Sequence, residues 1–352
     1  MMTVDPFLGM FLLVVAALAG GSFYVPFAKV KMWSWETYWL TQGIVAWLVM
    51  PVLVAWLTTP DLSTVFVQCS TRSLVLTFMF GVMWGVGSVT FGLSVRYLGI
   101  SLGMTVVVGL CAAFGTLIPP VVDGLLGQLL ATHSGWTVLS GVLLCLVGIV
   151  LCGCAGARKS HELTDQQKQA SIREFALVKG FVVATISGVM SAGMVYGLHA
   201  GKPIAQAALA SGASIAYQNN AVFVVILAGG FVVQAIFCLT MNICNQSMRQ
   251  YAAGPAVLLL RNYTLVGLAG ILWYTQLLFY GMGTTTMGEY AFAAWSILTA
   301  LVMVISMLWG LALKEWKGVS ARTLSLVWSG IAVLVLSAMV IGAGSHLAAS
   351  GR

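Results

Sequence analysis

The feature that most constrains this chain of 352 residues is a series of ten apolar runs, each about 20 residues or longer. A helix of about 20 residues crosses the hydrocarbon core of a bilayer, and in lipid a helix satisfies its own backbone hydrogen bonds. The sequence therefore predicts an all-α polytopic membrane protein with ten transmembrane helices. The runs cover residues 7–28, 37–58, 74–95, 101–122, 136–155, 177–199, 217–241, 262–283, 287–312 and 323–346.

The composition leaves no room for a soluble domain between these runs. Only 7% of the residues are charged, whereas soluble domains carry about 25%. The net charge of +7 comes from residues in loops and at helix ends, which argues against nucleic-acid binding. No histidine stands at metal-ligand spacing from Cys152 and Cys154, so we expect no metal site and no cofactor. Because no basic residue precedes the first run, we interpret it as a span and not as a signal peptide.

One polar segment, residues 157–176, divides the chain into two halves of five runs each, residues 1–156 and 177–352. If the N-terminus lies outside the cytoplasm, 13 of the 16 Lys and Arg residues fall in the inner connections. Positive residues favour the cytoplasmic side. We therefore expect the polar segment to be cytoplasmic and both termini to lie outside.

The two halves share the pattern Gly-x-x-Trp-x6-aromatic-Gly, at matching places in their third runs. It comprises Gly81, Trp84, Phe91 and Gly92 in the first half and Gly270, Trp273, Tyr280 and Gly281 in the second. Five spans per copy is an odd number, so the second copy enters the membrane from the opposite side. The pattern predicts two inverted five-helix repeats, and transporters of this type bind their substrate near the midplane between the copies.

Aromatic and amide side chains are the candidates for substrate binding. Trp273, Gln276 and Tyr280 share one helical face, and an aromatic ring beside an amide suits a sugar. The span centres hold no evident charge, which favours a neutral, hydroxyl-rich solute. The alternative is that these aromatic residues only pack between helices or anchor the interface. The candidate substrate-binding residues are Tyr24, Trp84, Phe91, Trp273, Tyr274, Gln276, Tyr280 and Trp295.

Two carboxylates lie near the ends of apolar runs. Glu289 is two residues into the ninth run, and an ionisable group in a span suggests a function, here proton coupling. The alternative is that Glu289 caps a helix N-terminus, where the dipole favours negative charge. For Glu36, at the start of the second run, we expect a capping role or a pairing with Lys29 or Lys31.

The chain contains the strings Phe23-Tyr24-x-Pro26-Phe27-x-Lys29, Trp33-Ser34-Trp35-Glu36-Thr37, Arg96-Tyr97-Leu98-Gly99, Trp273-Tyr274-x-Gln276 and Lys314-Glu315-Trp316. In order and spacing, over nearly the whole chain, these strings resemble the L-rhamnose–proton symporter family. The resemblance implies the drug/metabolite transporter superfamily, two inverted five-helix repeats, L-rhamnose as substrate, a proton gradient as driving force and the bacterial inner membrane, with both termini periplasmic. Enterobacterial members carry an aspartate where this chain has Ala291, so either Glu289 replaces it or the coupling differs.

We therefore predict a secondary active transporter that imports a neutral deoxy-sugar, foremost L-rhamnose, by proton symport with alternating access. Its partners are the sugar, protons and the lipid bilayer; the sequence fixes no oligomeric state and is compatible with a monomer. The spans lack a nucleophile–base pair or an acid–histidine cluster, so an enzyme is not expected. The alternative is an exporter or facilitator of another small metabolite or drug of the same superfamily. The absence of acidic residues from residues 7–28 weighs against the small multidrug exporters, which need a glutamate there.

Overall fold

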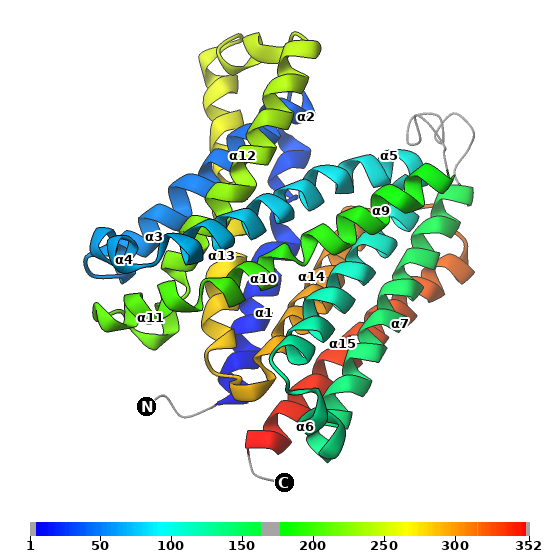
Figure 1. Cartoon of the computed structure of the whole chain (residues 1–352). Helices are drawn as coiled ribbons and strands as arrows, with labels where there is room; N and C mark the ends of the chain where they lie inside the picture. The colour runs from blue at the N-terminus through cyan, green and yellow to red at the C-terminus, as the bar shows by residue number, and fades with distance from the viewer. Residues whose placement is uncertain (1–4, 163–176, 315, 350–352) are drawn as a thin grey trace.

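The computed structural model describes residues 5–162, 177–314 and 316–349, and every regular element in this part of the chain is a helix (Figure 1). Nine segments of it are long and apolar enough to cross a membrane, and Val106–Ile118 is a shorter apolar helix. The polytopic all-α class is therefore confirmed. The nine segments are Phe7–Lys29, Trp35–Thr58, Thr71–Phe91, His133–Lys159, Val178–Ala210, Ile215–Cys244, Ala256–Thr284, Ala291–Ala312 and Ala321–Ala348.

The helices of the first half include short elements in the connections as well as the spans. They are α1 (Pro6–Ser22), η1 (Pro26–Lys29), α2 (Trp35–Gly43), η2 (Ile44–Val49), α3 (Met50–Thr58), α4 (Leu62–Gln68), α5 (Thr71–Val122), α6 (Leu126–Ala131) and α7 (His133–Glu162). Helix α7 continues past Ala157 to Glu162.

The second half likewise contains spans and short helices in the connections. Its elements are α9 (Leu177–Ser191), α10 (Gly193–Ala200), α11 (Lys202–Ala210), η3 (Ile215–Tyr217), α12 (Asn220–Cys244), η4 (Ser247–Tyr251), α13 (Ala256–Thr284), η5 (Gly288–Ala293), α14 (Ala294–Ala312) and α15 (Ala321–Ala349).

Helix α5 departs most from the prediction, because residues 74–95 and 101–122 form one continuous helical stretch. A straight helix would separate Phe80 from Phe114 by about 51 Å. Tyr196 nevertheless contacts both residues. Its ring centroid lies 5.9 Å from that of Phe80, and its hydroxyl donates to the Phe114 carbonyl at 3.3 Å. Helix α5 therefore doubles back, and Figure 1 shows its cyan part rising to the right and its teal part returning downward.

The second span is not a uniform α-helix. Between α2 and α3, residues Ile44–Val49 form the π-helix η2, a wider turn that often marks functional positions. Pro51 stands two residues after the end of η2 and has no N–H to donate to the helix. The span therefore has a local irregularity in its middle, and this irregularity carries Trp47.

The first and last spans meet at one edge of the molecule. The ring of Phe7, at the start of α1, lies 4.9 Å from the ring of His346, near the end of α15. In Figure 1 both helix ends lie at the lower edge. The two ends of the described chain are therefore on the same side of the bundle.

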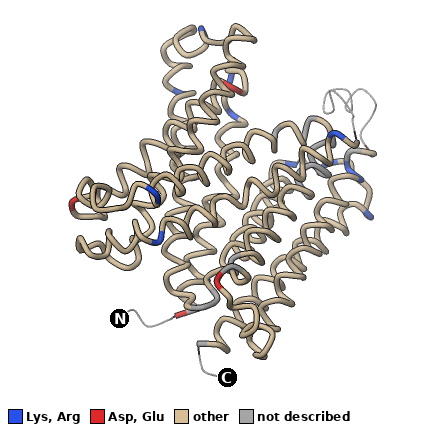
Figure 2. Tube along the Cα trace, in the orientation of Figure 1, with Lys and Arg blue, Asp and Glu red and all other residues tan. Residues whose placement is uncertain are grey.

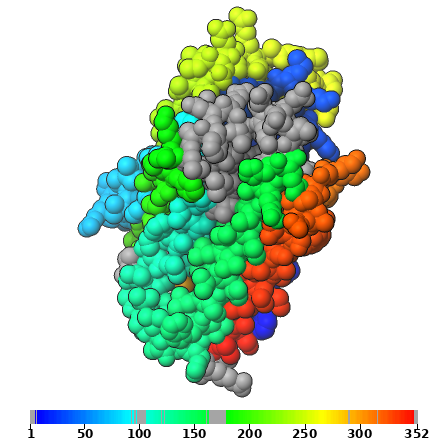
Figure 3. Space-filling model, turned by 90° about the vertical axis from the view of Figure 1, so that its right-hand side faces the viewer, coloured from blue at the N-terminus to red at the C-terminus, as the bar shows by residue number. Residues whose placement is uncertain are grey.

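Helices α7 and α15 run side by side through close glycine contacts, and their green and red atoms adjoin in Figure 3. A Cβ at Gly148 of α7 would lie 2.7 Å from Leu334 of α15. Beyond the C-terminal end of the α7 span, Glu162 accepts hydrogen bonds from the Ser320 backbone N–H and the Thr323 hydroxyl, both at 2.7 Å. These donors hold the pKa of the exposed Glu162 carboxyl below its usual range.

Candidate functional site

Three tryptophan rings from three different helices meet inside the bundle. Trp47 of η2 lies 4.6 Å from Trp84 of α5 and 5.5 Å from Trp273 of α13, measured between ring centroids. Trp84 and Trp273 are 5.6 Å apart. We call these residues the indole triad. The sequence predicted two of its members, and it missed Trp47, which belongs to no repeated pattern and stands in an ordinary apolar run.

The glycines of the repeated pattern bring these helices together. A Cβ at Gly81 would lie 2.0 Å from the Ile226 carbonyl oxygen in α12, and a Cβ at Gly270 would lie 2.8 Å from the Val45 Cβ in η2. Small residues of this kind let helix backbones approach closely in membranes. Each of the two glycines thus lets its helix pack closely against a helix of the other half. The tryptophan three residues after each glycine belongs to the triad.

Four buried polar atoms on the second span, α12 and α13 have no hydrogen-bond partner in the described part of the chain. A buried polar atom left unpaired costs about 1–3 kcal/mol, so the hydroxyl groups of a solute would be favourable partners. The amide nitrogen of Gln234 donates to the Trp39 carbonyl at 2.8 Å, but its oxygen is unpaired. The four atoms are Gln42 Oε1, Trp47 Nε1, Gln234 Oε1 and the Tyr274 hydroxyl oxygen.

These four side chains belong to the region where the second span meets α12 and α13. Gln42 and Trp47 are on the second span itself. Gln234 of α12 packs against Gly43 of that span, where a Cβ would lie 2.3 Å from its amide nitrogen. Tyr274 is fully buried, one turn after Gly270 on α13. The aromatic triad is thus accompanied by hydrogen-bonding groups from both halves.

The three side chains predicted to share one face of α13 contact different helices. Trp273 belongs to the triad, whereas the Gln276 amide fills the space beside Gly20 of α1. Tyr280 makes an edge contact with Trp295 of α14, with 5.4 Å between ring centroids. A Cβ at Gly115 would lie 2.8 Å from the Trp295 ring, so this second aromatic pair faces the returning part of α5.

Two predicted residues lie apart from this region. Tyr24 is half-exposed and stacks on Trp39, with ring centroids 6.0 Å apart. Phe91 packs in a small cluster with Val107 and Ala184. Neither ring contacts the indole triad among the residues described.

The side chain of Glu289, the predicted proton-coupling residue, lies outside the described part of the structure. Its backbone belongs to the 3-10 helix η5, which precedes α14. The ninth α-helix therefore begins at Ala294, later than the apolar run from residue 287 indicated.

Glu36 occupies a buried position at the start of α2. Its carboxylate accepts a hydrogen bond from Asn245 Nδ2 at 3.0 Å, and the Ser247 hydroxyl lies 2.7 Å away from it. The expected pairing with Lys29 or Lys31 is wrong, because neither lysine makes an ion pair with Glu36 in the described residues. The carboxylate is instead covered by neutral donors, Asn245 just after α12 and Ser247 of η4.

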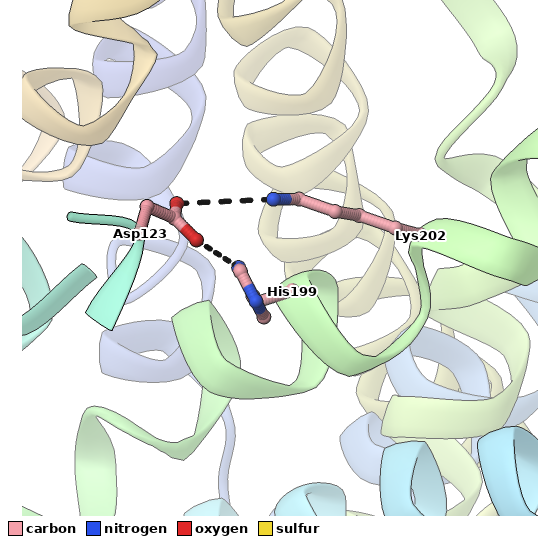
Figure 4. A network of polar contacts seen from close by, with 3 residues as sticks. All are labelled: Asp123, His199 and Lys202. Atoms are coloured by element: carbon pink, nitrogen blue, oxygen red, sulfur yellow. Dashed lines mark ion pairs between the residues drawn. The ribbon is translucent and has the colours of Figure 1, made fainter. Parts of the chain in front are cut away.

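A second polar cluster lies just beyond the C-terminal end of α5, as Figure 4 shows. Asp123 Oδ1 is 3.5 Å from His199 Nδ1, and Asp123 Oδ2 is 3.8 Å from Lys202 Nζ. All three side chains are partly exposed, so water screens their charges. The cluster ties the end of α5 to α10 and α11. No group of three or more His, Cys, Asp and Glu side chains suited to a metal occurs in the described chain.

Comparison with known proteins gives the family. Residues 2–348 match the family described as L-rhamnose-proton symport protein (RhaT). The chain belongs to this family. An L-rhamnose-proton symporter of Cronobacter sakazakii is 35% identical over 333 residues, 94% of this chain and 95% of its own length. That of Salmonella paratyphi A is 34% identical over 340 residues, 96% of this chain and 97% of its own.

Membership of the symport protein family confirms the resemblance read from the sequence motifs. It also agrees with the prediction of a transporter and not an enzyme. The family match runs through both halves of the chain and therefore includes all three helices of the indole triad.

Proposed function

We propose that this protein imports L-rhamnose together with protons, as a secondary active transporter that works by alternating access. The observation that carries the proposal is the indole triad, in which a tryptophan of the second half meets two of the first. In alternating access, the substrate binds between parts that move relative to each other. A site at the junction of the two halves meets this requirement.

We place L-rhamnose against the triad with its hydroxyl groups toward the four unpaired polar atoms. L-rhamnose is a neutral deoxy-sugar whose methyl and C–H groups suit the faces of Trp84 and Trp273. Its hydroxyls can both donate and accept hydrogen bonds, and this matches an array of amide oxygens and donors such as Trp47 Nε1 and the Tyr274 hydroxyl. Gln276, Tyr280 and Trp295 lie farther along α13 and α14 and would line the route to this site.

We further propose ten crossings, arranged as two inverted five-helix repeats of the drug/metabolite transporter superfamily, with residues 1–156 and 177–352 as the two repeats. The contact between Phe7 and His346 supports an even number of crossings, since both chain ends then lie on one side. The returning part of α5 would supply the tenth. The contacts of Gly81 and Gly270 support the inversion, because each glycine meets the second helix of the opposite half.

The orientation follows from the same arrangement. Figure 2 displays most Lys and Arg residues at the upper and right-hand ends of the helices, away from the lower edge where α1 begins. The side rich in positive residues is normally cytoplasmic. We therefore propose that both termini face the periplasm of a bacterial inner membrane and that Glu289, near the outer end of the ninth span, is a candidate for coupling the incoming proton.

Transport by purified protein in liposomes tests the proposal. Under an imposed inward proton gradient, the vesicles should accumulate labelled L-rhamnose above the external concentration, and a protonophore should abolish the accumulation. Equal fluxes with and without the gradient would indicate a facilitator. Efflux of other solutes without L-rhamnose uptake would favour an exporter of the same superfamily and overturn the assignment.

A further inference from the structure

One carboxylate in the described bundle is both buried and unused by the proposed sugar site. Glu36, the second residue of α2, has only 4% of its surface exposed. The other described acidic side chains, Asp5, Asp61, Asp123 and Glu162, are exposed. Ionisable groups within membrane spans are expensive and usually functional, so this difference in burial separates Glu36 from the rest.

The groups around Glu36 are neutral and come mainly from the second half of the chain. Asn245 donates to the carboxylate, and Ser247 Oγ lies between Glu36 Oε1, at 2.7 Å, and Asn242 Oδ1, at 2.8 Å. In the described chain no Lys, Arg or His side chain lies within ion-pair distance of it. The titratable neighbours are Tyr38 on α2, Cys238 on α12 and Tyr251 on η4. These are a phenol, a thiol and a phenol, which are ordinarily uncharged at pH 7.

This arrangement makes the charge of Glu36 depend on the contact between the two halves. A buried carboxylate stays ionised only while hydrogen-bond donors replace the lost water. Suppose that α12 and η4 move away from α2 and that no water takes the place of Asn245 and Ser247. The carboxylate then has no hydrogen-bond donors, and binding a proton removes its unpaired charge. Proton binding to Glu36 and separation of these elements therefore favour each other, and by linkage the effect is reciprocal.

Glu36 is also mechanically connected to the indole triad. Trp47 follows it by eleven residues on the same span, a distance of about 16 Å along a helix. The π-helix η2 begins between them, at Ile44. A displacement of the α2 end is therefore passed along one span to a ring of the proposed sugar site.

We propose that Glu36 is a proton-binding site of the transport cycle. A proton adds to a carboxylate oxygen of Glu36 as α2 parts from α12 and η4, and the same proton leaves to the inner solution when these elements rejoin and Asn245 and Ser247 donate again. The assignment rests on the proposed symport function. Glu289 retains its place as the candidate group near the outer end of the route.

Transport assays of Glu36→Gln provide the first test, with Glu162→Gln as the matched control. Both carboxylates accept hydrogen bonds from a serine, but Glu162 is exposed. Glu36→Gln should lose gradient-driven accumulation of L-rhamnose and keep at least half of the wild-type exchange of labelled for unlabelled sugar. Glu162→Gln should keep both. Wild-type accumulation by Glu36→Gln, or the loss of exchange together with accumulation, would overturn the proposal.

A second test needs no sugar and therefore separates this proposal from the proposed function. Cys244 adjoins Asn245, and both Cys244 and the distant Cys154 are free and exposed. The ratio of maleimide labelling at Cys244 to that at Cys154, read by peptide mass spectrometry, should change at least twofold between pH 7.5 and pH 5 in the wild type. It should be constant in Glu36→Gln. A constant ratio in the wild type, or an equal change in both proteins, would contradict the assignment even if L-rhamnose is transported.

Discussion

Trp84 and Trp273 hold the same place in the two Gly-x-x-Trp segments of the chain, and their indole rings lie 5.6 Å apart where the halves meet. In the proposed arrangement of two inverted repeats, residues at equivalent positions come into contact when they lie near the symmetry axis that relates the repeats. A site on this axis is approached from either side of the membrane through equivalent surroundings, which is what alternating access requires.

Removal of one indole of the triad should weaken sugar binding. We expect Trp273→Ala to lower the affinity for L-rhamnose about tenfold, equivalent to about 1.4 kcal/mol, because the sugar loses one aromatic face. Binding to purified protein, measured by isothermal titration calorimetry, checks this. The control is Trp328→Ala in α15, a half-exposed tryptophan; an equal loss of affinity in both variants would argue against the triad as the site.

The unpaired amide oxygen of Gln42 should contribute to recognition of the sugar hydroxyls. We expect Gln42→Leu to reduce L-rhamnose affinity while the melting temperature stays the same or rises, because an unsatisfied polar atom is removed from the interior. Equilibrium binding and thermal unfolding in detergent measure the two effects. Gln128→Leu, at an exposed position in α6, is the comparison. A lower melting temperature without any change in affinity would assign Gln42 to packing.

The close approach of α13 to η2 can be tested with two glycines of the same helix. Gly270→Ala should destabilise the protein by about 1–3 kcal/mol, because the added methyl overlaps Val45. Gly267→Ala should be neutral or stabilising, since nothing lies within 4 Å of its Cβ position and alanine favours helix. Thermal unfolding of both variants measures the difference, and equal melting temperatures would contradict the described contact.

The link between α7 and α15 should depend on pH through Glu162. Its pKa is lowered from the ordinary 4.5 by the hydrogen bonds of Ser320 and Thr323. A carboxyl with a lowered folded-state pKa stabilises the protein above 4.5, and this contribution is lost as the pH falls through the folded pKa. Glu162→Gln should therefore melt below the wild type at pH 7, and the two melting temperatures should converge as the pH falls well below 4.5. If the difference in melting temperature does not change with pH, the ionised carboxylate is not its cause.

The sequence was informative where a physical requirement acts on consecutive residues. The length of an apolar run is set by bilayer thickness, and most of the spans were accordingly found. The repeated glycines were also informative, because close helix approach restricts their positions to small residues. Helix α5 was predicted as two separate runs, whereas its backbone continues as one helix from Thr71 to Val122.

The remaining features depend on residues that are distant in the chain. Asn245 lies 209 residues from Glu36, and the sequence around either residue does not indicate that the two are in contact. Trp47 was overlooked because only the fold distinguishes it from a tryptophan in contact with lipid. Tyr24 was included on the strength of local pattern, and the structure places its half-exposed ring against Trp39, apart from the triad.

The contact between Phe7 and His346 also bears on how the protein is made. It joins two residues that lie far apart in the chain, so α1 is synthesised long before α15. Helix α1 therefore resides in the bilayer without this partner until the ribosome has completed α15. Contacts of such long sequence separation form slowly, and closure of this edge of the bundle is accordingly a late event in biogenesis.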